Sequence, residues 1–311
     1  MLPHPIPFLA DAVPPDITRN LAATTVAFTP TLLILGTAAL YLWGVRRANR
    51  SEPGSSWSTK RTMAFLGAMA VSFVALESVL GVYDDVLYYD HMIQHLVLLM
   101  VAAPLIAMGA PVELLERATG GRTHEVVVRL LRSRAAEVVG HPLVGFGLYA
   151  VLIPVAHLTA LYNYALSHEL AHDNEHLIFL VVGYLFWRPV VAIEPSRHPL
   201  HSGLRLLYLM AAMPVDAFCG LALVSATSEM FPVYTTFHRT WGPSLVGDLH
   251  AGGGIMWMGG GGLFLLALIP VVVMWLREED VKTRELDARL DAEDEAAAEA
   301  EAAGWDPLSP G

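Results

Sequence analysis

Histidines recur at a spacing of four residues in two apolar segments of this sequence. His91 and His95 form one pair, and His168, His172 and His176 form a ladder of three. Four residues advance an α-helix by about 6 Å and return the side chain to nearly the same face. Two imidazoles placed in this way can bind one metal ion, as in the HExxH zinc sites. The pattern therefore predicts a metal site built from two helices.

Further candidate ligands lie near these histidines. Imidazole suits zinc, copper, iron and nickel, and sulfur ligands shift the preference toward Cu(I). Met256 and Cys219 offer such sulfur atoms, although plain packing is the simpler interpretation of both. His250 opens the last apolar segment, two residues after Asp248. Other acidic residues near the histidines would attract cations: Asp84, Asp85, Asp90 and Asp173.

The composition indicates a polytopic membrane protein. Of 311 residues, 54% are hydrophobic and only 16% are charged, against roughly 25% charged in soluble domains. Residues 277–311 hold twelve Asp or Glu and four Lys or Arg, a net charge of −8 out of −11 for the whole chain. The rest of the chain is nearly neutral, so the sequence indicates no basic surface for binding nucleic acid. The single cysteine excludes a disulfide framework and a cysteine-based zinc site.

We expect an all-α fold, a bundle of seven transmembrane helices. A span needs about 20 mostly apolar residues, and backbone groups in lipid must be satisfied within the segment. Seven stretches qualify: about 24–45, 62–82, 91–112, 143–160, 172–193, 203–224 and 250–276.

The basic residues predict the orientation of the bundle. Seventeen of the nineteen Lys and Arg residues fall on one side, and only Arg19 and Arg239 fall on the other. Because basic loops stay in the cytoplasm, the N-terminus is expected outside and the C-terminus inside the bacterial cytoplasmic membrane. This gives an extracytoplasmic arm (1–23), the seven-helix domain (24–276) and an acidic cytoplasmic tail (277–311), which would be either a solvated helix or disordered.

The remaining polar residues allow plainer interpretations. His157 and His238 are expected to be hydrogen-bonding anchors at the membrane interface. Glu77 and Asp216 are costly inside spans, and each is either paired structurally or a proton or ion station. The other histidines are expected to be ordinary loop or arm residues: His4, His124, His141, His198 and His201.

Several motifs resemble those of the polytopic CtaG family of cytochrome c oxidase assembly factors. The resemblance covers about residues 60–275, and its most specific elements are HMIQHL at 91–96 and FWRP at 186–189. The supporting pieces are APL at 103–105, GAP at 109–111, His176, FPVY at 231–234, Asp248, GG at 252–253 and MW at 256–257. In the family a Gln often follows the Asp before the last span, whereas here Leu249 follows Asp248. His250 is a candidate to take over a ligand or supporting role at this position.

The resemblance implies a non-enzymatic accessory protein for the maturation of a haem–copper oxidase, with a link to copper delivery. His91 and His95 would be primary copper ligands, completed by His172 and His176 and by His168 or His250. The auxiliary residues would be Asp90 and Asp248, which orient imidazoles, with Met256 and Cys219. The expected partners are oxidase subunits, other copper chaperones and membrane lipid. Relatives can be fused to a CopD-like copper-uptake domain, and we expect this chain to act with separate partners.

Two other functions stay open, and the first of them would use the same histidines. A b-type haem carrier would need histidines from opposing helices at matched depth. A transporter of copper or another cation would use Glu77, Met213 and Asp216 as a path through the bundle. A retinal protein is excluded because Lys60 and Lys282, the two lysines of the chain, both lie outside the spans. Motifs of hydrolases and nucleotide-binding enzymes are absent from suitable contexts.

Overall fold

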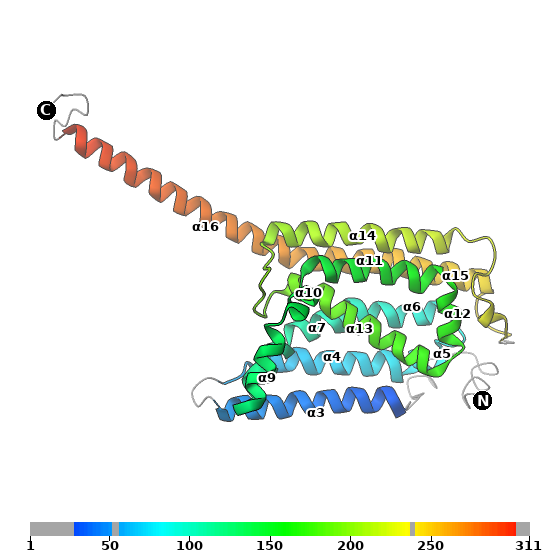
Figure 1. The fold of residues 1–311 in the computed structure, drawn as a ribbon. Coiled ribbons are helices and arrows are strands. Elements are labelled where there is room, and N and C mark those ends of the chain that lie inside the picture. Colours follow the sequence, from blue (N-terminus) through cyan, green and yellow to red (C-terminus); the bar gives the residue numbers. More distant parts are fainter. Residues whose placement is uncertain (1–27, 52–55, 237–239, 303–311) are drawn as a thin grey trace.

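The computed structural model describes residues 28–51, 56–236 and 240–302. Within these ranges the chain is helical and contains no β-strand, which confirms the all-α prediction. The long helices run side by side in one bundle, and the last helix continues far beyond it (Figure 1). The predicted N-terminal arm (1–23), His4 and His238 lie outside the described residues.

The bundle is assembled from long helices joined by short ones. Helix α11 is bent from α12 by 75° at Thr159, whose side chain accepts a hydrogen bond from the Leu161 N–H and so caps α12. In chain order the elements are α3 (Phe28–Ser51), α4 (Thr59–Glu77), α5 (Val79–Tyr83), α6 (Tyr88–Val97), η1 (Leu98–Ala102), α7 (Ala103–Met108), α8 (Pro111–Ala118), α9 (Gly121–Leu131), α10 (Arg134–Val139), α11 (Pro142–Leu158), α12 (Ala160–Leu166), α13 (Glu169–Val191), α14 (Ser202–Val224), η2 (Pro232–Thr236), α15 (Leu245–Gly254), η3 (Ile255–Gly260) and α16 (Gly261–Ala302).

Five helical segments of the described chain are long and apolar enough to cross a membrane. A sixth is added if α11 and α12 count as one broken span. The remaining predicted span, 172–193, corresponds to α13, which has 23 residues but carries several polar side chains near its start. The count of seven and the orientation therefore stay predictions. The five segments are Phe28–Ser51, Thr59–Tyr83, Tyr88–Ala118, Ser202–Val224 and Leu245–Ala300.

Small residues allow the long helices to approach closely. A Cβ atom at Gly145 of α11 would lie 2.5 Å from the Leu185 carbonyl oxygen of α13. One at Gly220 of α14 would lie 2.7 Å from the Gly253 carbonyl oxygen of α15. Small residues at such contacts are typical of helix packing in membranes. The aromatic core between these helices includes Tyr149, Phe179, Phe186 and Phe264, all fully buried.

Two π-helical turns interrupt long helices inside the bundle. Turn η1 precedes α7, where Pro104 lacks the N–H that would continue regular α-helical bonding. Turn η3 lies in the glycine-rich stretch between α15 and α16. Such turns occur frequently at functional sites. Here Leu99 of η1 and Met256 of η3 both line one internal cavity, described below.

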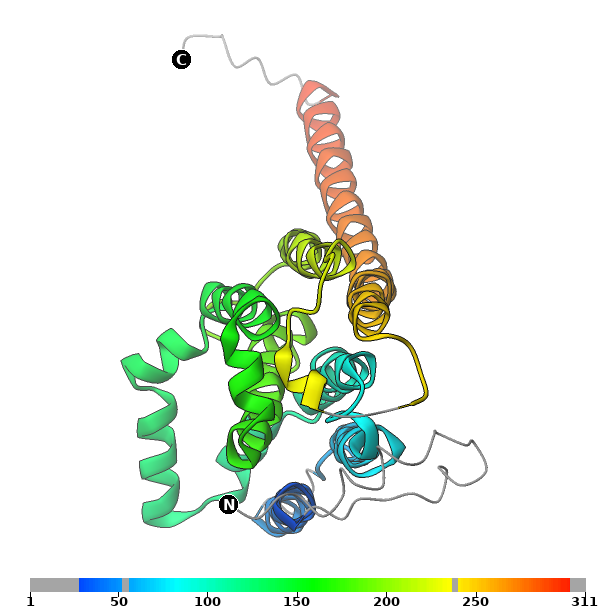
Figure 2. The ribbon, with the colours of Figure 1, turned by 90° about the vertical axis from the view of Figure 1, so that its right-hand side faces the viewer.

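The two ends of the bundle differ in character. One end, called here the cluster end, carries the α5–α6 turn, α12 and the start of α15. The opposite, arginine-rich end carries the short helices α8, α9 and α10, of which α9 and α10 stand out at the side of the bundle in the end-on view (Figure 2). Helix α16 extends from this same end (Figure 1), where the Ser202 hydroxyl donates a 2.7 Å hydrogen bond to Glu278.

Candidate functional site

Five imidazoles meet at the cluster end of the bundle. The histidine cluster consists of His91 and His95 on α6, His157 at the end of α11, and His172 and His176 on α13. His172 is half-buried and the other four rings are buried. The predicted i, i+4 pairs of two helices therefore face each other, although these helices are 71 or more residues apart in the sequence.

The rings pack directly against one another. The centroid of His91 lies 4.1 Å from that of His95, 5.1 Å from His172 and 5.6 Å from His176. The His172 and His176 centroids are 4.6 Å apart. The imidazoles of α6 and α13 therefore pack against one another at the centre of the cluster.

Several buried nitrogen and oxygen atoms at the centre of this cluster have no hydrogen-bond partner among the described residues. These atoms are Nε2 of His91, His95 and His176, together with Oε2 of Glu175. Leaving a buried polar atom without a partner costs about 1–3 kcal/mol. Four such atoms close together are typical of a binding site for an ion or a small ligand. All four atoms are of types that can bind a cation.

Two carboxylates supply negative charge to the cluster. Glu175 Oε2 lies 4.0 Å from His91 Nε2, and its Oε1 lies 4.0 Å from His95 Nε2. Asp84 Oδ2 lies 3.9 Å from His172 Nε2. Burial raises the pKa of Asp84 well above its usual range, and the neighbouring Asp85 charge raises it further. The site therefore contains a carboxyl group whose charged form needs a nearby cation.

His157 fixes the tautomer of His95. The Ile153 carbonyl oxygen, an acceptor, lies 2.8 Å from His157 Nδ1, so this nitrogen carries the proton and donates it. In the neutral ring, His157 Nε2 is then an acceptor, and it lies 3.2 Å from His95 Nδ1. His95 Nδ1 therefore donates, which leaves His95 Nε2 with its lone pair directed at the cluster. Such outer hydrogen bonds commonly orient metal-binding imidazoles.

Other predicted site residues lie apart from the cluster. His168 is exposed, because α13 begins only at Glu169 and the helical spacing does not extend to it. Its Nδ1 donates to the Tyr164 carbonyl oxygen. His250 Nε2 lies 2.8 Å from the Ala226 carbonyl oxygen. Asp90 is buried in the first turn of α6, and among the described residues it joins neither of the possible ligand groups.

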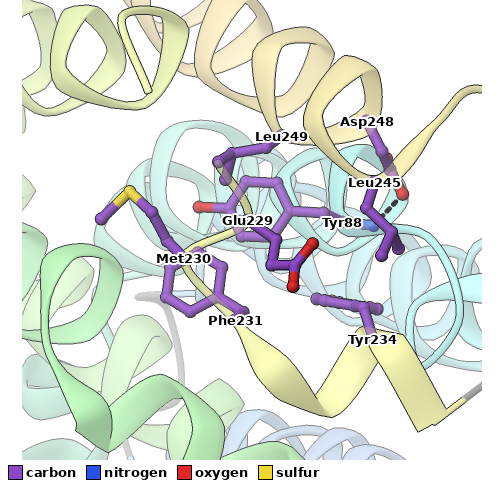
Figure 3. A pocket seen from close by; sticks show the side chains of 8 residues that line it. All are labelled: Tyr88, Glu229, Met230, Phe231, Tyr234, Leu245, Asp248 and Leu249. Atoms are coloured by element: carbon purple, nitrogen blue, oxygen red, sulfur yellow. Dashed lines mark hydrogen bonds between the residues drawn. The ribbon is translucent and has the colours of Figure 1, made fainter. Parts of the chain in front are cut away.

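Asp248 supports the site through the backbone of α6. Its carboxylate accepts hydrogen bonds from the Tyr88 and Tyr89 N–H groups at 3.1 and 3.0 Å. Figure 3 shows the hydrogen bond from the Tyr88 N–H to Asp248 beside a small pocket in which the Tyr88 ring packs near Phe231 and Tyr234. The first N–H groups of a helix have no acceptor within the helix, and a carboxylate placed there accepts their hydrogen bonds. Asp248 thus holds the start of the helix that carries His91 and His95.

A second cavity lies deeper in the bundle. Its lining includes His95 and His157 from the cluster, the buried carboxylate Asp216 of α14 and the thioether residues Met92 and Met256. Cys219 is buried one turn further along α14. Glu77, by contrast, accepts a 2.8 Å hydrogen bond from Thr31 between α3 and α4.

Sequence reasoning did not select Glu175 as a ligand and named Asp84 only as an acidic neighbour. Glu175 lies between His172 and His176 and three residues after the former, so helical spacing alone could have placed it beside them. Asp84 lies in the turn between α5 and α6, and no periodic pattern predicts where a turn residue points.

The fold and the site together define a helical membrane protein with a buried histidine–carboxylate cluster. The chain belongs to the cytochrome c oxidase caa3 assembly factor family (Caa3_CtaG), which matches residues 39–278.

Curated relatives are similar over most of this chain. The uncharacterized protein Mb0105 of Mycobacterium bovis is 30% identical over 281 residues, 86% of this chain and 41% of that protein. The uncharacterized protein ML1998 of Mycobacterium leprae is 28% identical over 258 residues, 80% of this chain and 38% of that protein. The chain therefore spans about two fifths of the length of these relatives. No solved structure matches it.

Proposed function

We propose that this protein binds copper at the histidine cluster and supplies it during assembly of a caa3-type cytochrome c oxidase. The unpartnered buried nitrogens of His91, His95 and His176 carry the proposal. Membership of the assembly factor family supports the oxidase as the recipient. The protein would act on an oxidase subunit as a non-catalytic partner, in the bacterial cytoplasmic membrane, with the cluster end facing outward.

The donor set favours copper over alkali or alkaline-earth ions. Imidazole nitrogens with one or two carboxylates suit copper and zinc, whereas calcium and magnesium prefer oxygen ligands. Cys219 joins neither ligand group among the described residues, so the cluster itself offers nitrogen and oxygen. A delivery protein must also release its ion, and the half-buried His172 beside Asp85 opens a route to the surface.

Metal retention tests this function. The protein purified in detergent is loaded with Cu(I) without oxygen or with Cu(II) in air, desalted, and assayed for bound copper. We expect retention by the wild type and by His168→Ala, and loss in the His91→Ala/His95→Ala double variant. Thermal unfolding checks that each variant is folded. A folded wild type that retains no copper in either state would contradict the proposal and favour a scaffold role.

Replacing His157 with Phe tests the orienting role of this residue. The substitution keeps an aromatic ring of similar size but removes the acceptor that fixes the His95 tautomer. We expect copper affinity to fall about 10–100-fold, measured by competition with a chromophoric chelator, with little change in the number of ions bound. Affinity equal to that of the wild type would mean that His157 only packs against the cluster.

A further inference from the structure

His91 lies at the junction of two possible ligand groups. One group contains Asp84, His91, His172 and His176, and the other contains His91, His95 and Glu175. Within each group the donor atoms all lie within 4.8 Å of one another. His91 is the one residue that the two groups share, and its side chain is fully buried.

The two nitrogens of His91 face different groups. Nδ1 lies 3.3 Å from His172 Nε2, which is itself 3.9 Å from Asp84 Oδ2. Nε2 lies 4.0 Å from Glu175 Oε2, and the other oxygen of Glu175 lies 4.0 Å from His95 Nε2. The ring is therefore oriented with one nitrogen toward each set of donors.

The spacing within each group fits a metal ion. Ligand bonds of about 2.0–2.1 Å in a tetrahedral arrangement separate two donor atoms by about 3.4 Å. Four of these donor pairs are 3.3 to 4.0 Å apart, and all the donor atoms of a group lie within 4.8 Å of one another, so side-chain adjustments of about 1 Å would bring either set onto an ion. Each group also holds one carboxylate, which offsets part of the charge of one cation.

From this geometry we infer that the cluster has two metal positions bridged by the imidazole of His91. The outer position uses Nδ1 of His91 with Asp84, His172 and His176. The inner position uses Nε2 of His91 with His95 and Glu175. The inference rests on the proposed metal binding and deepens it, because it makes the site a two-step path for the ion.

Exposure gives the path a direction. At the outer position the side chain of His172 is 15% exposed and the adjacent Asp85 is 32% exposed. At the inner position the side chains of His95 and Glu175 are 4% and 10% exposed, and His95 also lines the deeper cavity with Asp216 and Met256. The outer position therefore exchanges ions with the surroundings, and the inner one receives them through His91.

Filling both positions requires a change in the protonation of His91. A neutral imidazole has one lone pair and one N–H. With one ion bound at Nδ1, the proton stays on Nε2 and faces Glu175. When a second ion binds at Nε2, that proton leaves to solvent, and the ring becomes an imidazolate that binds both ions.

Stoichiometry with matched variants tests the inference. Cu(II) is titrated into the purified full chain, with ions counted after desalting and copper spins followed by electron paramagnetic resonance. We expect two ions in the wild type, with a signal that rises for the first equivalent and falls with the second, because imidazolate-bridged copper spins couple antiferromagnetically. Glu175→Gln and Asp84→Asn are each expected to bind one ion and keep the uncoupled signal.

Controls and contrary outcomes are distinct from those of the proposed function. Asp173→Asn, on the same helix as Glu175 but outside both ligand groups, is expected to bind two ions as the wild type does. One ion in the wild type, weakened by both variants, would overturn the two positions while leaving copper binding intact. A folded wild type that binds no Cu(II) would overturn the two positions, and one that retains neither Cu(II) nor Cu(I) would overturn both proposals.

Discussion

Replacing Glu194 with alanine is expected to lower the free energy of unfolding by about 3–5 kcal/mol, because the substitution removes a buried carboxylate that pairs with the half-buried Arg188 and accepts two further hydrogen bonds. Glu194 follows α13 at the arginine-rich end, and its side chain is 1% exposed. Its Oε2 accepts hydrogen bonds from Arg188 Nε at 2.9 Å and from the Tyr184 hydroxyl at 2.8 Å. Its Oε1 accepts a 2.7 Å hydrogen bond from the Val112 N–H at the start of α8. One carboxylate thus joins α8, α13 and the loop after it.

An exposed ion pair at the same end provides the control. Glu137 lies 2.6 Å from Arg197, and these side chains are 36% and 46% exposed. Pairs in water contribute about 0–1 kcal/mol, so Glu137→Ala should change stability little. Thermal and denaturant unfolding in detergent, followed by circular dichroism, compares the two variants. Equal losses of unfolding free energy in the two variants would show that the burial of Glu194 does not make its interactions more stabilising.

Replacing Asp248 with alanine is expected to lower the free energy of unfolding by about 2–4 kcal/mol, since it removes the acceptor of the buried Tyr88 N–H and of the partly buried Tyr89 N–H at the start of α6. Asp248 is 1% exposed, and water cannot readily replace it. Because α6 carries His91 and His95, copper affinity should fall as well. Asp248→Asn keeps one side-chain oxygen and should lose about half as much stability.

Ser244 offers a comparison with an ordinary helix cap. Its hydroxyl oxygen accepts a 3.1 Å hydrogen bond from the exposed Gly247 N–H at the start of α15, and loss of such a cap costs about 1 kcal/mol. Ser244→Ala should therefore reduce stability less than Asp248→Ala and leave copper affinity unchanged. The idea that Asp248 positions α6 fails if Asp248→Ala retains wild-type copper affinity.

The four-residue spacing of histidines predicted the centre of the site because helical geometry is local. It placed His91 with His95 and His172 with His176, and the structure brings both pairs together. The same rule failed to exclude His168 because a helix start cannot be located to the residue from apolar periodicity alone. The contacts of His157 and Asp84 depend on a bend at Thr159 and on the α5–α6 turn, which spacing does not describe.

Hydropathy predicted the long helices for a similar reason. Span length follows from the thickness of the hydrocarbon layer. The segments at α3, α4, α14 and α15–α16 could therefore be predicted from runs of apolar residues. Helix α13 is harder to assign because its polar residues serve the site and lower its hydropathy. The π-helical turns η1 and η3 have no periodic signal, although Pro104 and the glycine run mark where they lie.

The length of α16 separates two regions of opposite charge. The 26 residues from Arg277 to Ala302 rise about 39 Å at 1.5 Å per residue, and the residues whose burial is described there are exposed apart from the half-buried Ala300. At physiological ionic strength a charge is screened over about 8 Å. The acidic residues beyond the first turns of this rod are therefore too distant to neutralise Arg122, Arg129 and Arg132 on and beside α9. Those arginines therefore keep a positively charged surface of their own, while the far end of α16 presents an independent acidic surface.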